Sequence, residues 1–289
     1  MAARARRPRS RAPVLRPRDD GDDGEPLYWD QTNCIEVVPN AAGSDDMAPY
    51  DAFVAIDEAA ENWNGGTAEC SFMTLVAGEP SAGAVAETDP DGPNRNVIVW
   101  LEDSWPAAYP GTAAAITTLR FVDDADSAED GRIIDADIEL NGASVRFGIC
   151  QDEDCDRMDL ENTLTHELGH LLGMDHTCGD PLGQDPPLDD HGQPVPSCIG
   201  SLPAEIAEAT MFPIARPGDI FMRSPSQDDI DAICETYPAV GDPGVCNEPE
   251  PVGKRSGCSM IPGSRQPAEV WMVVLVVALG ALRRRALTT

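Results

Sequence analysis

Histidine is scarce in this chain of 289 residues, where it occurs four times. Basic residues are also few, with 20 lysines and arginines against 51 aspartates and glutamates, so the formal net charge at pH 7 is −31. This balance argues against a nucleic-acid partner, because neutralising phosphates requires a basic surface. We interpret most of the acidity as a solvated surface that keeps the protein soluble.

A C-x-x-C pair is missing among the nine cysteines, which argues against a cysteine-zinc module. Their number instead favours disulfides in an exported protein. Pairing nearest neighbours along the chain predicts four bridges: Cys34–Cys70, Cys150–Cys155, Cys178–Cys198 and Cys234–Cys246. Cys258 is then left unpaired, and sequence alone does not establish this connectivity.

Residues 1–24 lack the apolar segment of a secretory signal. Seven arginines fall within the first 18 residues, and an acidic run follows them. This composition predicts a disordered leader; an arginine-rich segment that binds an anionic surface is the alternative. The sequence therefore shows no recognisable export signal at this end.

Residues 25–238 carry the periodic patterns of one mixed α/β (α+β) domain. A helix is predicted over 47–64, where Phe53, Ile56, Ala60 and Trp63 recur on one face. Apolar runs predict five strands: 34–38, 71–76, 96–101, 115–122 and 133–140. Strands before and after one helix, with a further helix at the end, indicate a twisted mixed sheet with helices packed on it.

Three of the four histidines lie in one short segment with the spacing H-E-x-x-H-x-x-G-x-x-H. His166 and His170 are four residues apart, so a helix places both imidazoles on one face. His176 follows as a third ligand. Three nitrogen ligands leave a fourth tetrahedral position for water, which is the arrangement of a catalytic zinc site.

Two residues between these histidines have their own predicted roles. Glu167 follows the first ligand and is placed to take a proton from a zinc-activated water. Gly173 is expected to end the helix through a left-handed backbone conformation, so that His176 can turn back toward the metal.

The helix that carries the motif is predicted over 159–172, with Asp159 as its N-cap. At about 100° per residue, the histidines point away from an apolar stripe that would pack on the sheet. The stripe consists of Leu160, Leu164, Leu168, Leu171 and Leu172. The helix can therefore pack against a core and present metal ligands at once.

The segments around this helix support weaker predictions. Residues 177–210 are expected to form a long loop, with His191 on its surface. A last helix is predicted over 224–238, with a capping box of Ser224 and Gln227. The acidic stretches 123–130 and 152–156 could hold Ca²⁺, although neither fits the twelve-residue calcium loop.

Together these motifs resemble a known family of zinc peptidases. The segment from His166 to His176 resembles the metzincin zinc-binding consensus, and Met211 resembles the methionine of the Met-turn that follows it. Within that clan the chain is most similar to matrixins, the matrix-metalloproteinase-like peptidases, and to their bacterial relatives. The resemblance covers roughly residues 25–238.

The resemblance implies a metzincin fold, with a twisted, mostly parallel sheet and one antiparallel edge strand, here 115–121. A peptide substrate would add a strand along that edge. Met211 would form a hydrophobic floor beneath the zinc ligands. Residues 212–222 would wall the pocket for the side chain after the cut bond.

Three departures from the family pattern bear on this assignment. Phe212 replaces the usual tyrosine, so no phenol is available there to contact the zinc. Thr177 follows the third histidine, where adamalysin-like members have aspartate. No cysteine precedes Cys34, so the cysteine-switch propeptide of animal matrixins is absent from this sequence.

The last part of the chain is predicted to be a linker, 239–266, followed by a short hydrophobic tail, 267–289. Its apolar run, 270–282, is shorter than the ~20 residues of a full membrane span. A buried helix is the alternative to membrane contact. An apolar run ended by arginines resembles the sorting signals of myxobacterial surface proteins, which implies processing near Cys258 and attachment to the cell surface.

The sequence thus predicts an exported or surface-attached zinc endopeptidase that acts as a monomer on extracellular proteins. Peptides are its expected partners, and the tail is its only expected membrane contact. A non-catalytic binding module that keeps the zinc fold is one alternative, although Glu167 would then be unnecessary. A peptidase of another metzincin branch is the second alternative.

Overall fold

The structure is a computed structural model of the chain. It describes residues 26–86, 95–124, 126–152, 154–179 and 194–246, together with the backbone of 270–277. The predicted leader 1–24, His191 and Cys258 lie outside the described residues. The linker 239–266 is described only as far as residue 246.

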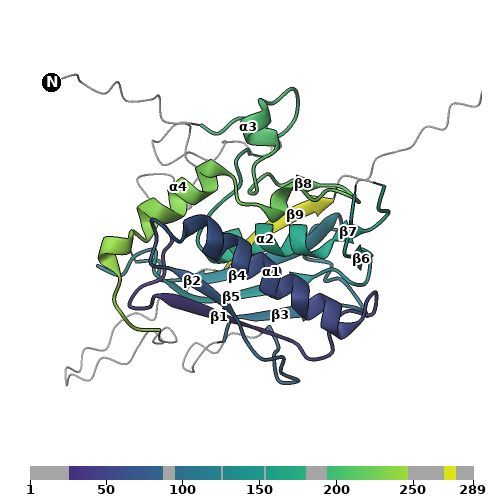
Figure 1. The fold of residues 1–289 in the computed structure, drawn as a ribbon, viewed down its shortest axis with the longest axis horizontal. Helices are drawn as coiled ribbons and strands as arrows, with labels where there is room; N and C mark the ends of the chain where they lie inside the picture. The colour runs from purple at the N-terminus through teal and green to yellow at the C-terminus, as the bar shows by residue number, and fades with distance from the viewer. Residues whose placement is uncertain are drawn as a thin grey trace, which may run out of the picture.

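The described residues form a mixed α/β fold around a mostly parallel sheet of five strands in the order β2-β1-β3-β5-β4 (Figure 1). The strands are β1 (Cys34–Pro39), β2 (Thr74–Ala77), β3 (Val97–Trp100), β4 (Ala113–Phe121) and β5 (Ile133–Leu140). Neighbours among β2, β1, β3 and β5 pair in parallel, whereas β4 pairs antiparallel to β5. The predicted mixed α/β class with one antiparallel strand is therefore confirmed.

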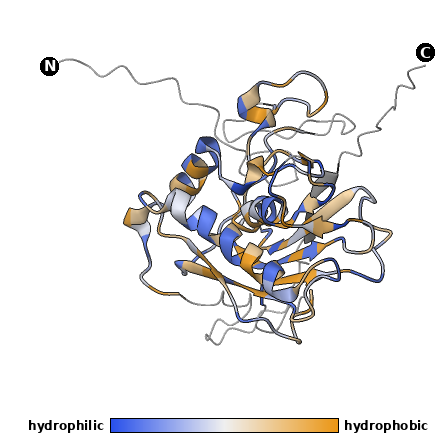
Figure 2. Cartoon of the chain, turned by 45° about the vertical axis from the view of Figure 1, so that its right-hand side comes forward, coloured by the Kyte–Doolittle hydropathy of each residue, from blue (hydrophilic) through white to orange (hydrophobic). Residues whose placement is uncertain are grey.

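Two long helices, α1 (Pro49–Thr67) and α2 (Leu160–Leu171), lie against the same face of the sheet (Figure 1). Hydrophobic residues gather along the strands and where the helices meet them (Figure 2). The shorter helices are α3 (Ala204–Ala207), α4 (Gln227–Thr236), η1 (Phe221–Arg223) and η2 (Ala239–Gly241). Burying α1 and α2 on one layer produces a single main core in which α2 is central.

The predicted elements are all present, with ends shifted by a few residues. The last helix is shorter than predicted, and its capping box consists of Ser226 and Asp229. The prediction of Ser224 and Gln227 was wrong, because Ser224 lies two residues before the N-cap. Its carbonyl instead accepts a hydrogen bond from the Thr210 hydroxyl.

β4 was predicted to be the edge of the sheet, and this was wrong. Its outer side pairs antiparallel with β9 (Val270–Val277), and β9 pairs in parallel with β8 (Ile214–Ala215). Residues 270–277 of the predicted tail are therefore an extended strand of the sheet. Of the described residues, no helix is both long and apolar enough to cross a membrane.

The described residues contain four disulfides, and two of them match the predicted pairs, Cys150–Cys155 and Cys178–Cys198. The other two pairs were predicted wrongly, because the bridges are Cys34–Cys246 and Cys70–Cys234. Both connect segments far apart in the sequence: Cys234 of α4 joins the chain just after α1, and Cys246, beyond α4, joins the start of β1. The amide of Asn33, for example, donates to the carbonyl of Val245. Several disulfides suggest an oxidising, extracellular environment.

The opposite face of β5 carries three buried acidic side chains, Asp135, Asp137 and Glu139. They alternate with Ala136 and Ile138 of the main core, as expected for a strand. The amide of Val97 donates to Asp137, and the Tyr109 hydroxyl donates to Glu139. Burial, followed by the charge of Asp135, raises the pKa of Asp137 to about 8.

Candidate metal centre

Helix α2 begins at the predicted N-cap. The Asp159 carboxylate accepts a hydrogen bond from the amide of Asn162 at 2.8 Å, which satisfies one of the free amides at the helix start. The predicted leucine stripe is buried in full: Leu160, Leu164, Leu168, Leu171 and Leu172. This apolar face fixes the rotation of α2, and with it the direction of the histidines.

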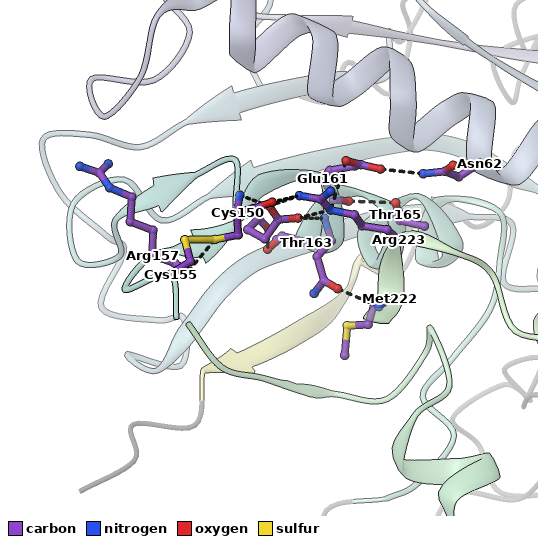
Figure 3. A network of polar contacts seen from close by, with 11 residues as sticks. Asn62, Cys150, Cys155, Arg157, Glu161, Thr163, Thr165, Met222 and Arg223 are labelled. Atoms are coloured by element: carbon purple, nitrogen blue, oxygen red, sulfur yellow. Dashed lines mark hydrogen bonds and ion pairs between the residues drawn. A yellow bond between two sulfur atoms is a disulfide. The ribbon is translucent and has the colours of Figure 1, made fainter. Parts of the chain in front are cut away.

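A partly buried ion pair holds the same helix end to the chain after the Met211 turn (Figure 3). Arg223 of η1 donates two hydrogen bonds to the Asp159 carboxylate, at 2.8 and 2.6 Å, and one to the carbonyl of Cys150. Glu161 lies 3.2 Å from the same guanidinium and accepts a bond from Asn62 of α1. Residues 221–223 are therefore bound to α2, and no local pattern in the sequence predicts this role for Arg223.

The three motif histidines converge on one point. Their Nε2 atoms lie 3.0 Å apart for His166 and His170, 3.1 Å for His170 and His176, and 3.3 Å for His166 and His176. Metal–nitrogen bonds of about 2.1 Å at tetrahedral angles would place such atoms about 3.4 Å apart. The spacing of the three nitrogens therefore suits one metal ion.

Hydrogen bonds on the far side of two rings fix which nitrogen faces this point. His166 Nδ1 donates to the carbonyl of Thr210 at 2.7 Å, and His170 Nδ1 donates to the carbonyl of Met174 at 2.8 Å. A carbonyl oxygen can only accept, so in the neutral rings Nδ1 carries the hydrogen. The Nε2 lone pairs of His166 and His170 are then free to bind a metal.

Burial keeps both rings neutral. It lowers the pKa of His166 to about 4, and burial with the neighbouring histidines lowers the pKa of His170. Unprotonated Nε2 atoms about 3 Å apart repel one another, because no hydrogen lies between them to form a bond. A cation at their centre removes that repulsion, so the donor set fits a metal.

Glu167 is fully buried beside the histidines. The Thr117 hydroxyl of β4 lies 2.6 Å from Glu167 Oε2, whereas Glu167 Oε1 is buried with no hydrogen-bond partner. Burial raises the pKa of Glu167 to about 8, and the Thr117 bond opposes that shift. A buried acceptor without a partner is costly, so Oε1 is open to a donor such as a water molecule in the site.

The backbone after α2 turns as the sequence predicts. Gly173 has φ of 99°, and a Cβ on it would lie 2.5 Å from the carbonyl oxygen of Leu27. Both the conformation and the close approach require glycine. Gly169, one turn earlier, lies against the sulfur of Met211, which is fully buried in the core. Met211 thus packs directly under the helix that carries His166 and His170.

The turn that contains Met211 is held by the start of α4. The Asp229 carboxylate, fully buried, accepts hydrogen bonds from the Thr210 amide and from the amide and hydroxyl of Ser226. The carbonyl of Thr210 is the acceptor for His166 Nδ1. Asp229 therefore holds the residue that orients a metal ligand.

Thr117 and Asp229 were not predicted as site residues. A sequence signal exists for Thr117, because it is the polar member of an otherwise apolar row on β4: Ala115, Thr117, Leu119 and Phe121. For Asp229 the signal was the capping box that was assigned to the wrong serine.

The structure does not test the predicted Ca²⁺ sites in the acidic stretches 123–130 and 152–156. Among the described residues, the only group of three or more potential side-chain ligands close enough for one ion is the histidine trio. In the stretch 123–130, the Asp124 and Asp130 carboxylates accept hydrogen bonds from nearby backbone amides. The calcium prediction stays a prediction.

Comparison with known proteins does not identify the chain. No protein-family model matches it, and no curated protein matches it. The functional assignment therefore rests on the geometry of the histidine cluster and its surroundings.

Proposed function

We propose that the protein is an exported zinc endopeptidase of the metzincin clan, related to matrixins. The observation that carries this proposal is the convergence of the Nε2 atoms of His166, His170 and His176 beside the unpartnered Oε1 of Glu167. A structural zinc site is usually closed by a fourth protein ligand. In the described residues three ligands meet, and Glu167, which follows the first of them in the sequence, offers a buried carboxylate suited to proton transfer.

Bound zinc would acidify a water molecule and polarise the carbonyl of the peptide bond. The protein's own residues have separate tasks around it. Glu167 accepts the proton of the attacking water and delivers it to the leaving amine. Thr117 holds the other carboxylate oxygen in place. The carbonyls of Thr210 and Met174 hold the rings of His166 and His170 in the binding orientation.

Several features support the metzincin assignment in particular. Gly173 allows the turn that brings the third histidine back, and Met211 packs against α2 at Gly169, between the first two histidines in the sequence. The antiparallel strand β4 contacts the motif helix α2 through Thr117 and Glu167. A peptide adding a strand beside β4 would pass over the site. Disulfides are consistent with action outside the cell.

The decisive experiment compares the protein with its Glu167→Gln variant. Gln keeps the size and one acceptor of the side chain but cannot take the proton. We expect one zinc per chain in both proteins by elemental analysis. Hydrolysis of casein and of a quenched peptide should fall by at least about 10³-fold in the variant, consistent with loss of a general base.

Two results would contradict the proposal. Near-normal hydrolysis by Glu167→Gln would exclude the assigned base. A wild-type protein that binds zinc but cleaves no member of a broad peptide library would favour the non-catalytic binding module instead. A chelator control separates metal-dependent cleavage from contaminating peptidases.

A further inference from the structure

Strand β9 lies where a peptide partner of β4 would lie. It runs antiparallel to β4 from Ala113 to Arg120, and it runs parallel to β8 on its other side. Its backbone is thus clamped between a strand of the main sheet and the segment after the Met211 turn (Figure 1). This is the geometry of an extended peptide added to a sheet.

The register places the middle of β9 at the candidate metal centre. Thr117 is paired with Val273, and its two neighbours on β4 are paired with Met272 and Val274. The side chain of Thr117 leaves the plane of the sheet toward α2, where its hydroxyl lies 2.6 Å from Glu167 Oε2. The residue of β4 that contacts the proposed general base is therefore the same residue that pairs with Val273 of β9.

Occupancy by β9 is incompatible with a second strand at the same place. One side of β4 is used by β5, and the other side is used by β9. A strand offers each neighbour a single row of amides and carbonyls. His166, Glu167 and His170 are also fully buried in this arrangement. A peptide that adds to this side of β4 must therefore displace β9 first.

We propose that the surface between β4 and β8 binds an extended peptide strand and that its resident occupant is the chain's own segment 270–277. The segment competes with external peptides and thereby keeps the site closed. The peptidase part of this inference rests on the proposed function, whereas the occupancy itself does not. The composition of 270–277, Val-Trp-Met-Val-Val-Leu-Val-Val, has high strand propensity and no charge.

A tethered occupant competes strongly even when its intrinsic affinity is modest, because its effective concentration is in the millimolar range. The apparent affinity for an external peptide equals its intrinsic affinity multiplied by the fraction of molecules in which β9 has left β4. If one molecule in ten or fewer is open, releasing the segment raises apparent peptide affinity by about 10-fold or more.

The test uses the full chain with two prolines in the strand, Met272→Pro and Val273→Pro. Neighbouring residues of a strand direct their amides to opposite sides, so one of the two changes removes a donor to β4. The matched control carries two prolines outside β9, Ala286→Pro and Leu287→Pro. Circular dichroism and zinc content establish that each variant is folded.

Two readouts need no catalytic activity. Hydrogen exchange should accelerate by at least about 10-fold at the alternate β4 amides of residues 115–120 that face β9, while those facing β5 stay protected. A labelled peptide of residues 270–277, flanked by lysines for solubility, should bind the strand variant at least about 10-fold more tightly than the wild type or the control. Hydrolysis of a quenched peptide is then measured separately and should rise in parallel.

The outcomes are distinguishable. Unchanged exchange of these β4 amides, or equal peptide binding by the strand and control variants, overturns the occupancy. Faster exchange and tighter binding without any hydrolysis by either protein support the occupancy and contradict the proposed peptidase function. If the wild type is an active peptidase and the strand variant shows faster amide exchange but the same rate of hydrolysis, then β9 does not compete with substrate.

Discussion

Replacing Thr117 by Val tests how the candidate base is held. Valine has nearly the shape of threonine, and it would lie in the row of Ala115 and Leu119, which are both buried. The change deletes the hydroxyl 2.6 Å from Glu167 Oε2 and leaves the strand otherwise intact. Because Oε1 already lacks a partner, the variant carboxylate has no hydrogen bond from the described protein groups.

The size of the effect follows from that single bond. A hydrogen bond to a charged group contributes about 1.5–3 kcal/mol, and the rates are therefore compared above pH 8, where Glu167 is ionised. If this energy holds Glu167 in its reactive orientation, kcat should fall by about 10- to 100-fold, at 1.36 kcal/mol per factor of ten. KM should change little, because the hydroxyl faces the carboxylate and does not face the groove. Zinc content should stay at one per chain.

Two further variants separate positioning from general damage. Thr117→Ser keeps the hydroxyl and should recover most of kcat. In the Glu167→Gln background, Thr117→Val should have little further effect on the residual rate, because the charge that the hydroxyl serves is gone. The reasoning is refuted if zinc-loaded Thr117→Val keeps kcat within about twofold of the wild type, or if Ser and Val variants are equally impaired.

Two other predictions concern the backbone and the buried carboxyls. Gly173→Ala should lower both zinc affinity and thermal stability. The control Gly200→Ala also has a positive φ, of 120°, but its Cβ would meet no atom within 4 Å, so it should cost only about 1–2 kcal/mol of backbone strain. Equal losses for the two variants in calorimetry and zinc titration would contradict the role of the Leu27 contact. Asp137 has a folded-state pKa of about 8, above its ordinary 3.8, so its favourable contribution is complete below pH 4 and is lost as the pH rises toward 8. Asp137→Asn should therefore become more stable relative to the wild type by about 1.4 kcal/mol per pH unit over that range, and denaturant unfolding that shows a pH-independent difference would disprove it.

Local patterns were sufficient to predict the helix at the centre of the site. Its N-cap Asp159, its leucine stripe and the positive φ of Gly173 are all signalled by residue type and spacing within a few residues of the chain, even though each also makes contacts with distant segments. The direction of His166 and His170 then follows from the burial of the stripe. The metal cluster was predictable because all three of its ligands lie within eleven residues of sequence.

Contacts between distant segments were not predictable in the same way. The nearest-neighbour rule paired the two short-range disulfides correctly, whose cysteines are 5 and 20 residues apart. It failed for the pairs separated by 212 and 164 residues, because those depend on where α4 and the chain after it pack against the first part of the fold. The same limit applies to β9, since its apolar composition suits a buried strand, a buried helix or a membrane segment equally well.

The backbone of β4 and its Thr117 side chain make separate contacts. Its backbone pairs with β9, at the place where we propose that an external peptide binds, and its side chain at Thr117 contacts the candidate base Glu167. Exchange of β9 for an external peptide alters the backbone pairing on one side only. The pairing with β5 still fixes the direction of Thr117 toward Glu167. Displacement of β9 therefore need not disturb Glu167. A peptide that took the place of β9 would meet a carboxylate that is already held in position.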